Sequence, residues 1–363
     1  MAKGSIVAVA MSGGVDSSVA AAVLLEKGYQ PFGLTMRLWV DPRYEEQTAQ
    51  GCCSLEDVQD ARRVADHLGI AHYTLNMKDE FRQEVVDNFI KEYCLGRTPN
   101  PCVVCNAKIK FGSLLNKIEG LEASALATGH YVRKGWDNSR GRYYLQKGVD
   151  PSKDQSYTLY HLTQEQLGRA LFPLGDLHKE QVRQKAYELG LPVAEKGESQ
   201  EVCFIPGNDY REFLSSRVGS FSPGPIVDTA GNVLGEHKGL PYYTIGQRRG
   251  LGITASEPLY VIEIRTKDNT LVVGSHEETY HKGLIASSLN FIAREEPEEP
   301  MEVNARIRYQ ASEVPAILYP PDNEGNARLL FHQPQRAVTP GQSVVFYIGP
   351  DIVLGGGIIT SSL

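Results

Sequence analysis

The chain has 363 residues, of which 41% are hydrophobic and 22% are charged, so its composition is that of a globular protein and not of a disordered or collagen-like one. No apolar run approaches the ~20 residues that cross a bilayer, and no secretory signal opens the chain, so we expect a cytoplasmic protein with no membrane partner. The net charge of −7 excludes a uniformly basic surface, so any nucleic-acid site must be a local basic face.

The first third of the chain predicts an α/β doubly wound domain, because short β-branched runs alternate with helical periodicity. We assign residues 1–144 to this domain. The elements predicted in it are a strand at 5–11, a helix at 18–27, a strand at 31–38, a helix at 55–68 begun by a Ser54 cap, a strand at 72–75, a helix at 80–93 and a strand at 124–128.

The rest of the chain predicts two further kinds of structure. Residues 145–219 are expected to form a small, mostly helical linking region, with its clearest helices at 164–171 and 179–189. Short alternating runs follow, with turn residues at 230–232, 267–269 and 322–325. They predict a β-rich central domain over 220–294 and a C-terminal β-barrel over 295–363, with the acidic stretch 294–300 as a connector between barrel units.

The segment S-G-G-V-D-S at residues 12–17 lies between the first predicted strand and the first predicted helix. Its glycines let successive backbone N–H groups face one concavity, and the helix N-terminus adds partial positive charge, which suits a phosphate group. The segment is not a G-x-x-x-x-G-K-[ST] loop, because no lysine follows, and it is not the dinucleotide fingerprint. A glycine turn with a capping serine is the structural alternative.

Cysteines carry a second signal. Cys102 and Cys105 form a C-x-x-C at the start of a predicted helix, whose N-terminus lowers the pKa of a thiol. Far along the chain, Cys203 follows the Ser-Gln-Glu of residues 199–201, and a small buried hydrophobe in a strand is the alternative interpretation for it. No fourth ligand at a suitable spacing supports a zinc site. The remaining cysteines show no usable pattern and are expected in the core or in incidental loops: Cys52, Cys53 and Cys94.

The loop resembles the S-G-G-x-D-S signature of the pyrophosphate-loop ATP pyrophosphatases. A closer resemblance, to the bacterial tRNA-specific 2-thiouridylases, covers essentially the whole chain. It rests on R-T-P-N-P-C-V-V-C-N, S-Q-E-V-C-F, A-T-G-H-Y, K-D-Q-S-Y, T-I-G-Q-R-R-G and R-I-R-Y. The resemblance implies a tRNA-uridine sulfurtransferase that transfers AMP from ATP to O2 of the wobble uridine, releases pyrophosphate and introduces sulfur at C2 to give 2-thiouridine.

The resemblance also implies site residues and partners. In the family, the residue matching Cys203 carries a persulfide, and the one matching Cys105 liberates its sulfur and forms a disulfide with it. The implied substrates are the glutamine, lysine and glutamate tRNAs, and the implied sulfur donor is a persulfide relay protein, a cysteine desulfurase or sulfide. The residues implied for ATP and magnesium are Ala10, Met11, Ser12, Gly13, Gly14, Val15, Asp16, Ser17, Met36 and Gly129. Those implied for tRNA are Asn100, Pro101, Cys102, His130, Lys153, Asp154, Gln155, Arg308, Tyr309 and Gln342.

One departure from the family pattern leaves the sulfur chemistry open. Many relatives carry aspartate where this chain has Cys102, so the acid/base or positioning role of that aspartate does not transfer to the thiol. Cys102, Cys105 and Cys203 could instead hold a [4Fe–4S] cluster with one open iron, since thiolates suit iron–sulfur chemistry. Two rival functions also remain: another adenylating ligase, of the argininosuccinate- or lysidine-forming type, and a non-catalytic RNA-binding iron–sulfur protein.

Basic residues fall into three groups that together predict a tRNA track, although each residue alone is more often a solvated surface charge. Tyr309 is expected either to stack an unstacked anticodon base or to pack in the barrel core. The first group is Arg133, Lys134, Arg140, Arg142, Lys147 and Lys153, the second is Arg248 and Arg249, and the third is Arg306 and Arg308.

Overall fold

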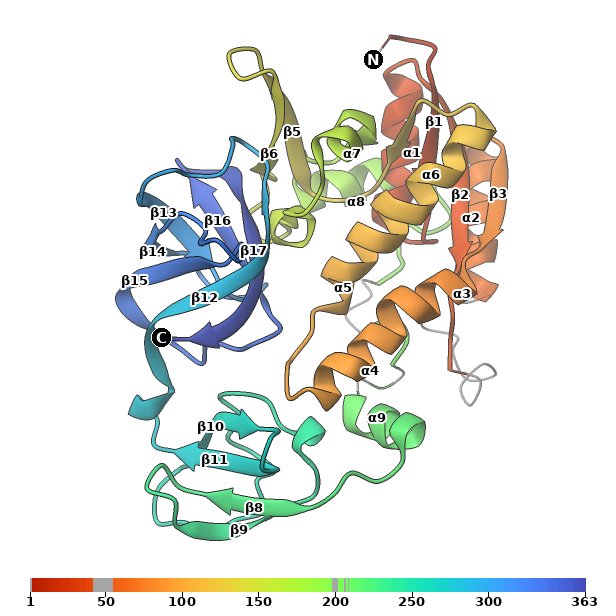
Figure 1. Ribbon diagram of the computed structural model, residues 1–363. Helices are drawn as coiled ribbons and strands as arrows, with labels where there is room; N and C mark the ends of the chain where they lie inside the picture. The colour runs from red at the N-terminus through yellow and green to blue at the C-terminus, as the bar shows by residue number, and fades with distance from the viewer. Residues whose placement is uncertain (1, 42–54, 198–201, 206, 208) are drawn as a thin grey trace.

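The computed structural model describes residues 2–41, 55–197, 202–205, 207 and 209–363. Figure 1 shows three units: an α/β unit that contains the N-terminus, a β-barrel that contains the C-terminus, and a small β-rich unit below both. The predicted Ser54 cap, Cys52, Cys53 and the segment 199–201 lie outside the described residues.

The α/β unit is built on a five-stranded sheet of order β3-β2-β1-β4-β7, in which every pairing is parallel. The centre of β1 is fully buried, as expected for a parallel strand covered on both faces. The predicted helix at 164–171 is wrong at its end, because Ala170–Leu171 leaves the helix to pair with β4. The strands are β1 (Ile6–Ala10), β2 (Gln30–Arg37), β3 (His72–Asn76), β4 (Ala125–Ala127) and β7 (Ala170–Leu171).

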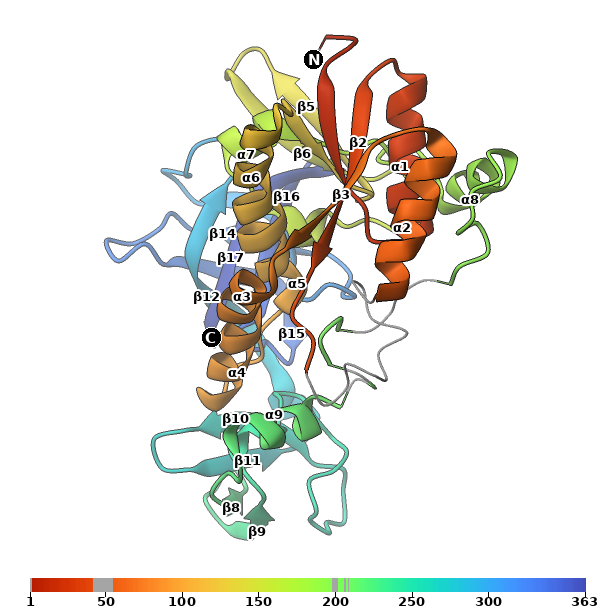
Figure 2. The same ribbon diagram turned by 90° about the vertical axis from the view of Figure 1, so that its right-hand side faces the viewer.

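Helices cover both faces of this sheet (Figure 2). On one face α1, α2 and α8 share an apolar cluster, to which Val19, Val64 and Val182 contribute. On the other face a long helical run packs on β2, and it begins at Lys78, two residues before the predicted start. The helices of the first face are α1 (Val15–Glu26), α2 (Leu55–Leu68) and α8 (Lys179–Glu188). Those of the second are α3 (Lys78–Phe81), η2 (Arg82–Val86), α4 (Asp87–Cys94), α5 (Pro101–Val104), η3 (Cys105–Leu114), α6 (Leu115–Lys117) and η4 (Ile118–Leu121).

Six antiparallel strands form the C-terminal barrel, which closes where β12 pairs with β17. This pairing corrects two predictions. Strand β12 was expected in the central domain but belongs to the barrel, and the connector at 294–300 joins β12 to β13 inside the barrel instead of linking two units. The strands are β12 (Tyr280–Phe291), β13 (Met301–Arg306), β14 (Val314–Leu318), β15 (Ala327–Arg336), β16 (Ser343–Ile348) and β17 (Ile352–Ser362).

A hairpin from the α/β unit extends the barrel sheet, since β6 pairs with β17 at Leu145 and Val353, both fully buried. The barrel and the α/β unit therefore share one continuous hydrogen-bonded sheet. The hairpin is β5 (Val132–Asp137) and β6 (Arg142–Lys147), and the connecting helices are η5 (Ser156–Leu159) and α7 (Gln164–Arg169).

The central unit is a four-stranded sheet of order β10-β11-β8-β9. The three predicted turns are confirmed, because each lies between paired antiparallel strands. Tyr210 of α9 stacks on Tyr93 of α4 with ring centroids 4.9 Å apart, which attaches this unit to the α/β unit. The elements are α9 (Tyr210–Val218), β8 (Gly224–Val227), β9 (Val233–His237), η7 (Leu240–Tyr242), β10 (Tyr260–Arg265), β11 (Thr270–Gly274) and η8 (Glu277–Thr279). Among the described helices, none has the length and apolar character needed to span a membrane.

Candidate nucleotide and sulfur-transfer site

The predicted phosphate loop follows β1 at the point where the strand order reverses between β2 and β4. Ligands of open α/β sheets bind at such points, beyond the carboxyl ends of the strands. Gly13 has a φ of +70°, and a Cβ there would lie 2.4 Å from the backbone oxygen of Asp57. The backbone N–H of Ser12 donates to Oγ of Ser17 at 3.1 Å, which closes the turn at the start of α1.

The aspartate of the loop is held by two side chains from distant segments. Oδ1 of Asp16 accepts a hydrogen bond from the Tyr131 hydroxyl at 2.7 Å and an ion-paired one from Nζ of Lys179 at 2.6 Å. Gly129 lies against the backbone of Asp16. The segment that follows β4 and the phosphate loop that follows β1 therefore lie at the same edge of the sheet. Sequence reasoning missed Lys179, because it is 163 positions from Asp16 and no local motif marks it.

Polar side chains from β2 and β3 lie next to the start of the loop. Thr35 of β2 donates to the backbone oxygen of Met11 at 3.0 Å, and its Oγ1 is 2.8 Å from Nε2 of His72. Burial lowers the pKa of His72. Met36 is buried in the neighbouring apolar cluster, and its predicted adenine contact stays a prediction.

The C-x-x-C segment begins α5, as predicted. Oδ1 of Asn100 caps the helix by accepting from the backbone N–H of Val103 at 3.2 Å, and Pro101 occupies the first turn. Cys102 is exposed, whereas Cys105 is half-buried at the start of η3, whose turns are of the π type. Burial lowers the pKa of His161 to about 4, so the ring at 2.9 Å from the carbonyl oxygen of Val103 is neutral and donates to it.

Cys203 lies in a turn, so the strand interpretation of this residue is wrong. The next residue anchors it, because the buried ring of Phe204 packs edge to face against Phe81, Phe89 and Phe213. Cys203 and Cys105 both pack against the apolar cluster that contains these rings. This shared cluster spans much of the molecule, and the role of the two cysteines in sulfur transfer stays a prediction.

The third cysteine, Cys102, is exposed. The pKa of Tyr309 is raised by burial and by the charge of Asp154, and Cys102 acts in the same direction. Across the described residues, no three His, Cys, Asp or Glu side chains are grouped as a metal-ligand set. In this arrangement, the three thiols do not fit a shared iron–sulfur cluster.

The segment that leads to these cysteines is clamped by the barrel. The backbone N–H of Thr98 donates to Pro340 O at 2.9 Å, and Nε2 of Gln342 donates to Thr98 O at 2.8 Å. Oγ1 of Thr98 is also within 3.5 Å of Oγ1 of Thr244 in the central unit. Gln342, predicted as a tRNA contact, thus positions the segment before α5.

Several other predicted tRNA residues also have intramolecular partners. Asp154 is 7% exposed and accepts from the backbone N–H of Gly148 and from Ser156, while Oε1 of Gln155 accepts from Tyr131 N at 3.0 Å. Arg308 donates to the backbone oxygens of residues 336 and 337. Their roles toward tRNA stay predictions, as does that of the half-buried Lys153.

His130 and Tyr309 differ in accessibility. His130 is 7% exposed, its Nδ1 is 2.8 Å from Oγ1 of Thr128, and burial, with the charge of Lys110, holds its pKa well below the usual range. The ring is therefore neutral at physiological pH. Tyr309 is 37% exposed, and its hydroxyl donates to Asp154 O at 3.4 Å, so its ring is accessible to a base.

The first basic group is largely engaged within the protein. Arg133 pairs with Asp351 at 2.6 Å, and Lys147 pairs with Glu313 at 2.7 Å. Nζ of Lys134 donates to two backbone oxygens, and burial lowers its pKa to about 8. These residues tie the β5–β6 hairpin to the barrel and to α7.

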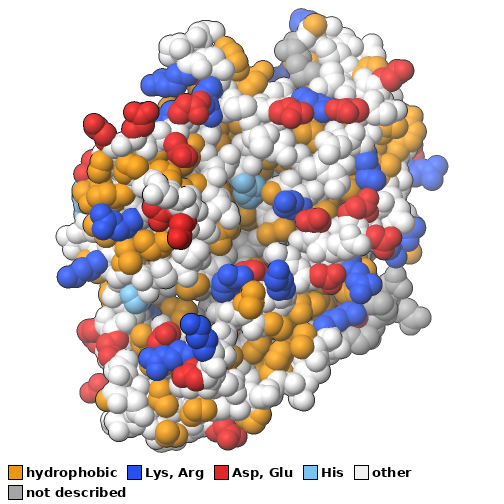
Figure 3. Space-filling view, in the orientation of Figure 1, with side chains coloured by type: hydrophobic (Ala, Val, Ile, Leu, Met, Phe, Trp, Pro, Cys, Tyr) orange, Lys and Arg blue, Asp and Glu red, His pale blue; other side chains and the backbone are white. Residues whose placement is uncertain are grey.

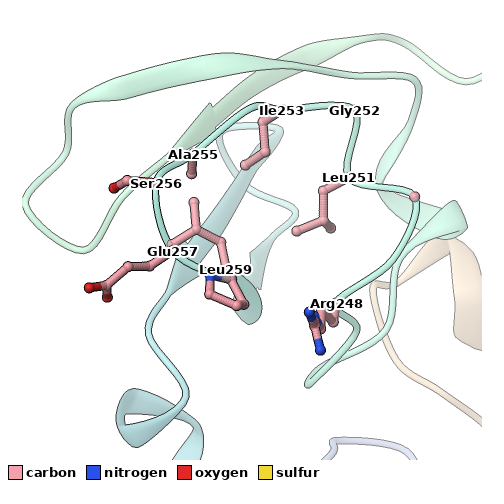
Figure 4. Close-up of a pocket in the computed structure, with 10 residues that line it drawn as sticks. Arg248, Leu251, Gly252, Ile253, Ala255, Ser256, Glu257 and Leu259 are labelled. Atoms are coloured by element: carbon pink, nitrogen blue, oxygen red, sulfur yellow. The ribbon is translucent and has the colours of Figure 1, made fainter.

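Arg248 and Arg249 of the central unit differ from that group. Both are exposed, and within the described part of the chain neither has a carboxylate at ion-pair distance. Arg248 stands at one end of an open pocket of about 400 Å³, apart from the apolar side chains of Leu251, Ile253 and Leu259 (Figure 4). Figure 3 shows basic side chains, with acidic ones among them, across the lower half of this face.

Known proteins match the chain along its length. Three family models match in succession: a tRNA methyl transferase HUP domain over residues 5–207, a tRNA methyl transferase PRC-barrel domain over 211–275 and an aminomethyltransferase β-barrel domain over 281–359. The tRNA-specific 2-thiouridylase of Acetivibrio thermocellus is 53% identical over 355 residues, 97% of this chain and 98% of its own. That of Caldanaerobacter subterraneus is 54% identical over 357 residues, 97% of each chain.

Among solved structures, a 4-thiouridine synthetase in an RNA complex with bound ATP is 19% identical to this chain. It covers 59% of this chain and 50% of its own, with a TM-score of 0.37.

The HUP unit, its phosphate loop and the two β units that follow define a multidomain nucleotide-using enzyme of the tRNA-modifying class. The chain belongs to the tRNA-specific 2-thiouridylase family. The predicted family and fold class are confirmed, and the ligase and non-catalytic alternatives lose their support.

We expect alanine at Gly13 and alanine at Gly14 to change the stability by very different amounts. Gly13→Ala combines a positive φ with a 2.4 Å approach to Asp57 O, so we expect it to lower the free energy of unfolding by about 2 kcal/mol or more. Gly14→Ala meets only Oγ of Ser12 at 3.5 Å, and we expect a change within about 0.5 kcal/mol. Urea unfolding of both variants measures this, and equal losses would contradict the loop geometry.

Proposed function

We propose that this enzyme adenylates O2 of the wobble uridine of tRNA with ATP and replaces that oxygen with sulfur. Membership in the 2-thiouridylase family carries the proposal. The supporting geometry is a phosphate loop at the sheet's switch point, with a capped C-x-x-C helix in the same unit. Because the substrate is tRNA, we place the enzyme in the cytoplasm.

In the adenylation step, ATP occupies the loop at residues 10–17. Uridine O2 attacks the α-phosphorus, and the bond to the bridging oxygen breaks, so that pyrophosphate leaves with the electron pair. Magnesium accompanies the phosphates, and Asp16 beside the loop offers the carboxylate oxygen that this ion prefers. Burial lowers the pKa of His72 behind the loop, which disfavours a competing positive charge there.

In the sulfur step, Cys203 carries a persulfide supplied by a donor. The Cys105 thiolate attacks the inner sulfur of Cys203, and the terminal sulfur leaves as hydrosulfide. Hydrosulfide adds to C2 of the uridine, the C2–O bond breaks, and AMP departs. The Cys105–Cys203 disulfide that remains is reduced by a cellular dithiol. This pairing is carried over from the family, whose motifs contain residues that match both cysteines.

The tRNA is proposed to lie across the junction of the three units. Tyr309 offers an accessible ring, which suits stacking of an unpaired base next to the reacting uridine. Arg248 and Arg249 offer guanidinium groups for the phosphate backbone. The glutamine, lysine and glutamate tRNAs and the class of donor belong to the same proposal.

Serine substitutions separate the two steps. We expect Cys105→Ser and Cys203→Ser to lower 2-thiouridine formation about 100-fold or more, because each removes a sulfur nucleophile. Release of pyrophosphate that depends on tRNA should stay near the wild-type rate, since adenylation comes first. Mass spectrometry of anticodon nucleosides and a pyrophosphate assay measure the two. Cys94→Ser is the control, because Cys94 is exposed at the end of α4. Normal thiolation by either test variant would refute the persulfide route.

The alternative mechanism predicted from the sequence uses a [4Fe–4S] cluster on Cys102, Cys105 and Cys203, although the three thiols do not form one ligand set in the described residues. Iron and sulfide assays on anaerobically purified enzyme distinguish the two. The persulfide route predicts full activity without stoichiometric iron. If the enzyme contains about four iron atoms for each chain and needs them for activity, the cluster mechanism replaces the persulfide route.

Neutralising the unpaired arginines tests the tRNA surface. We expect the double variant Arg248→Ala, Arg249→Ala to bind tRNA more weakly and to reduce the slope of log affinity against log salt by about 1–2, because one or two phosphate contacts are lost. Arg265→Ala is the matched control, since this arginine of the same unit pairs with Glu263. Filter binding over a salt series measures the slope, and an unchanged slope would remove these arginines from the interface.

A further inference from the structure

A lysine from outside the phosphate loop reaches the loop's aspartate. Lys179 is 8% exposed, and its Nζ lies 2.6 Å from Oδ1 of Asp16 and 5.9 Å from the centroid of the Tyr131 ring. Tyr131 donates to the same oxygen at 2.7 Å. Side chains from α1, from the segment after β4 and from the start of α8 therefore converge on one point of the loop.

The fold holds this ammonium group in place from behind. The backbone N–H of Lys179 donates to Oδ2 of Asp150 at 2.9 Å, and Asp150 is itself 7% exposed. Val182 and Ala186 of the same helix are fully buried in the cluster that contains Val19 of α1. Figure 2 shows α8 on the same side of the sheet as α1. A lysine on a flexible surface helix would lack this fixed relation to the loop.

The loop itself lacks a cation. Residues 12–17 contain no lysine, whereas G-x-x-x-x-G-K-[ST] loops place a lysine on the β- and γ-phosphates. Breaking the bond to the α-phosphorus concentrates negative charge on the departing pyrophosphate. A fixed ammonium in a site with little water stabilises such charge more strongly than one in bulk solvent.

We propose that Lys179 is the phosphate-binding cation of this site: it binds the β- and γ-phosphates of ATP and stabilises pyrophosphate as the leaving group. An ammonium group has three donors, so Lys179 can keep its bond to Asp16 while it donates to phosphate oxygens. Tyr131 donates to the same oxygen of Asp16, so the carboxylate keeps its position when Lys179 also donates to phosphate. The inference rests on the proposed nucleotide site and adds to it a residue that the loop motif does not contain.

Calorimetric titration of the full chain with magnesium pyrophosphate and, separately, with AMP tests the assignment. We expect Lys179→Met to weaken pyrophosphate binding about 10-fold or more, because a charge-assisted contact is lost, while AMP affinity stays near wild type. Lys179→Arg should restore part of the affinity. Lys185→Met is the control, because Lys185 lies on the same helix and pairs with Glu26.

A double-mutant cycle separates direct binding from support of Asp16. If Lys179 contacts the phosphates, Lys179→Met weakens pyrophosphate binding further in an Asp16→Asn background. Two results would overturn this inference and leave the proposed function in place. One is that Lys179→Met causes no further loss in the Asp16→Asn background. The other is that Lys179→Met alone binds pyrophosphate normally, while the enzyme still forms 2-thiouridine. A wild-type enzyme that binds neither AMP nor pyrophosphate overturns the inference and the nucleotide site together.

Discussion

The chemistry depends on the clamp between the barrel and the segment before α5. The backbone N–H of Thr98 donates to Pro340 O, and its backbone oxygen accepts from the Gln342 side chain. Both polar groups of the Thr98 backbone are therefore bonded to the barrel. Gly341 between them has a φ of +92°, and a Cβ there would lie 2.8 Å from Thr98 N. Since Cys102 and Cys105 follow this segment directly, the barrel sets the position of the thiols on the α/β unit.

Two buried histidine rings near α5 and η3 are kept uncharged by their burial. His161 and His130 are both neutral because desolvation lowers their pKa, and His161 supports the first turn of α5 through Val103 O. A protonated ring at either position would carry an unpaired buried charge, which is costly. The two buried rings beside α5 and η3 are therefore uncharged, and neither adds a positive charge to the apolar cluster in that region.

The sequence predicted features whose cause is local. The loop at 12–17, the helix that starts at the C-x-x-C and the three hairpin turns each follow from a few neighbouring residues, and the structure has them in place. Features that need a distant partner were missed. Strand β7 exists because β4 offers an edge, and β12 joins the barrel because β15 and β17 pair with it.

The same limit applies to charges. Counting basic residues grouped Arg133 and Lys147 with a tRNA track, although their carboxylate partners, Asp351 and Glu313, lie 218 and 166 positions away. Conversely, Lys179 occupies an ordinary place at the start of an amphipathic helix, and only the packing of α8 on α1 brings it to Asp16. Electrostatic partners across domains are set by tertiary structure, which periodicity and spacing do not encode.

A line of hydrogen bonds connects the phosphate loop to the exposed tyrosine of the barrel. Tyr131 donates through its hydroxyl to Asp16 and through its backbone N–H to Gln155, and the neighbouring Asp154 accepts from Tyr309 at its backbone and from Arg306 at its carboxylate. The K-D-Q segment therefore links Tyr131, which holds Asp16, to Tyr309 of the barrel unit. The position of the phosphate loop relative to the exposed Tyr309 ring thus depends on tertiary contacts of this segment and not on the loop motif alone.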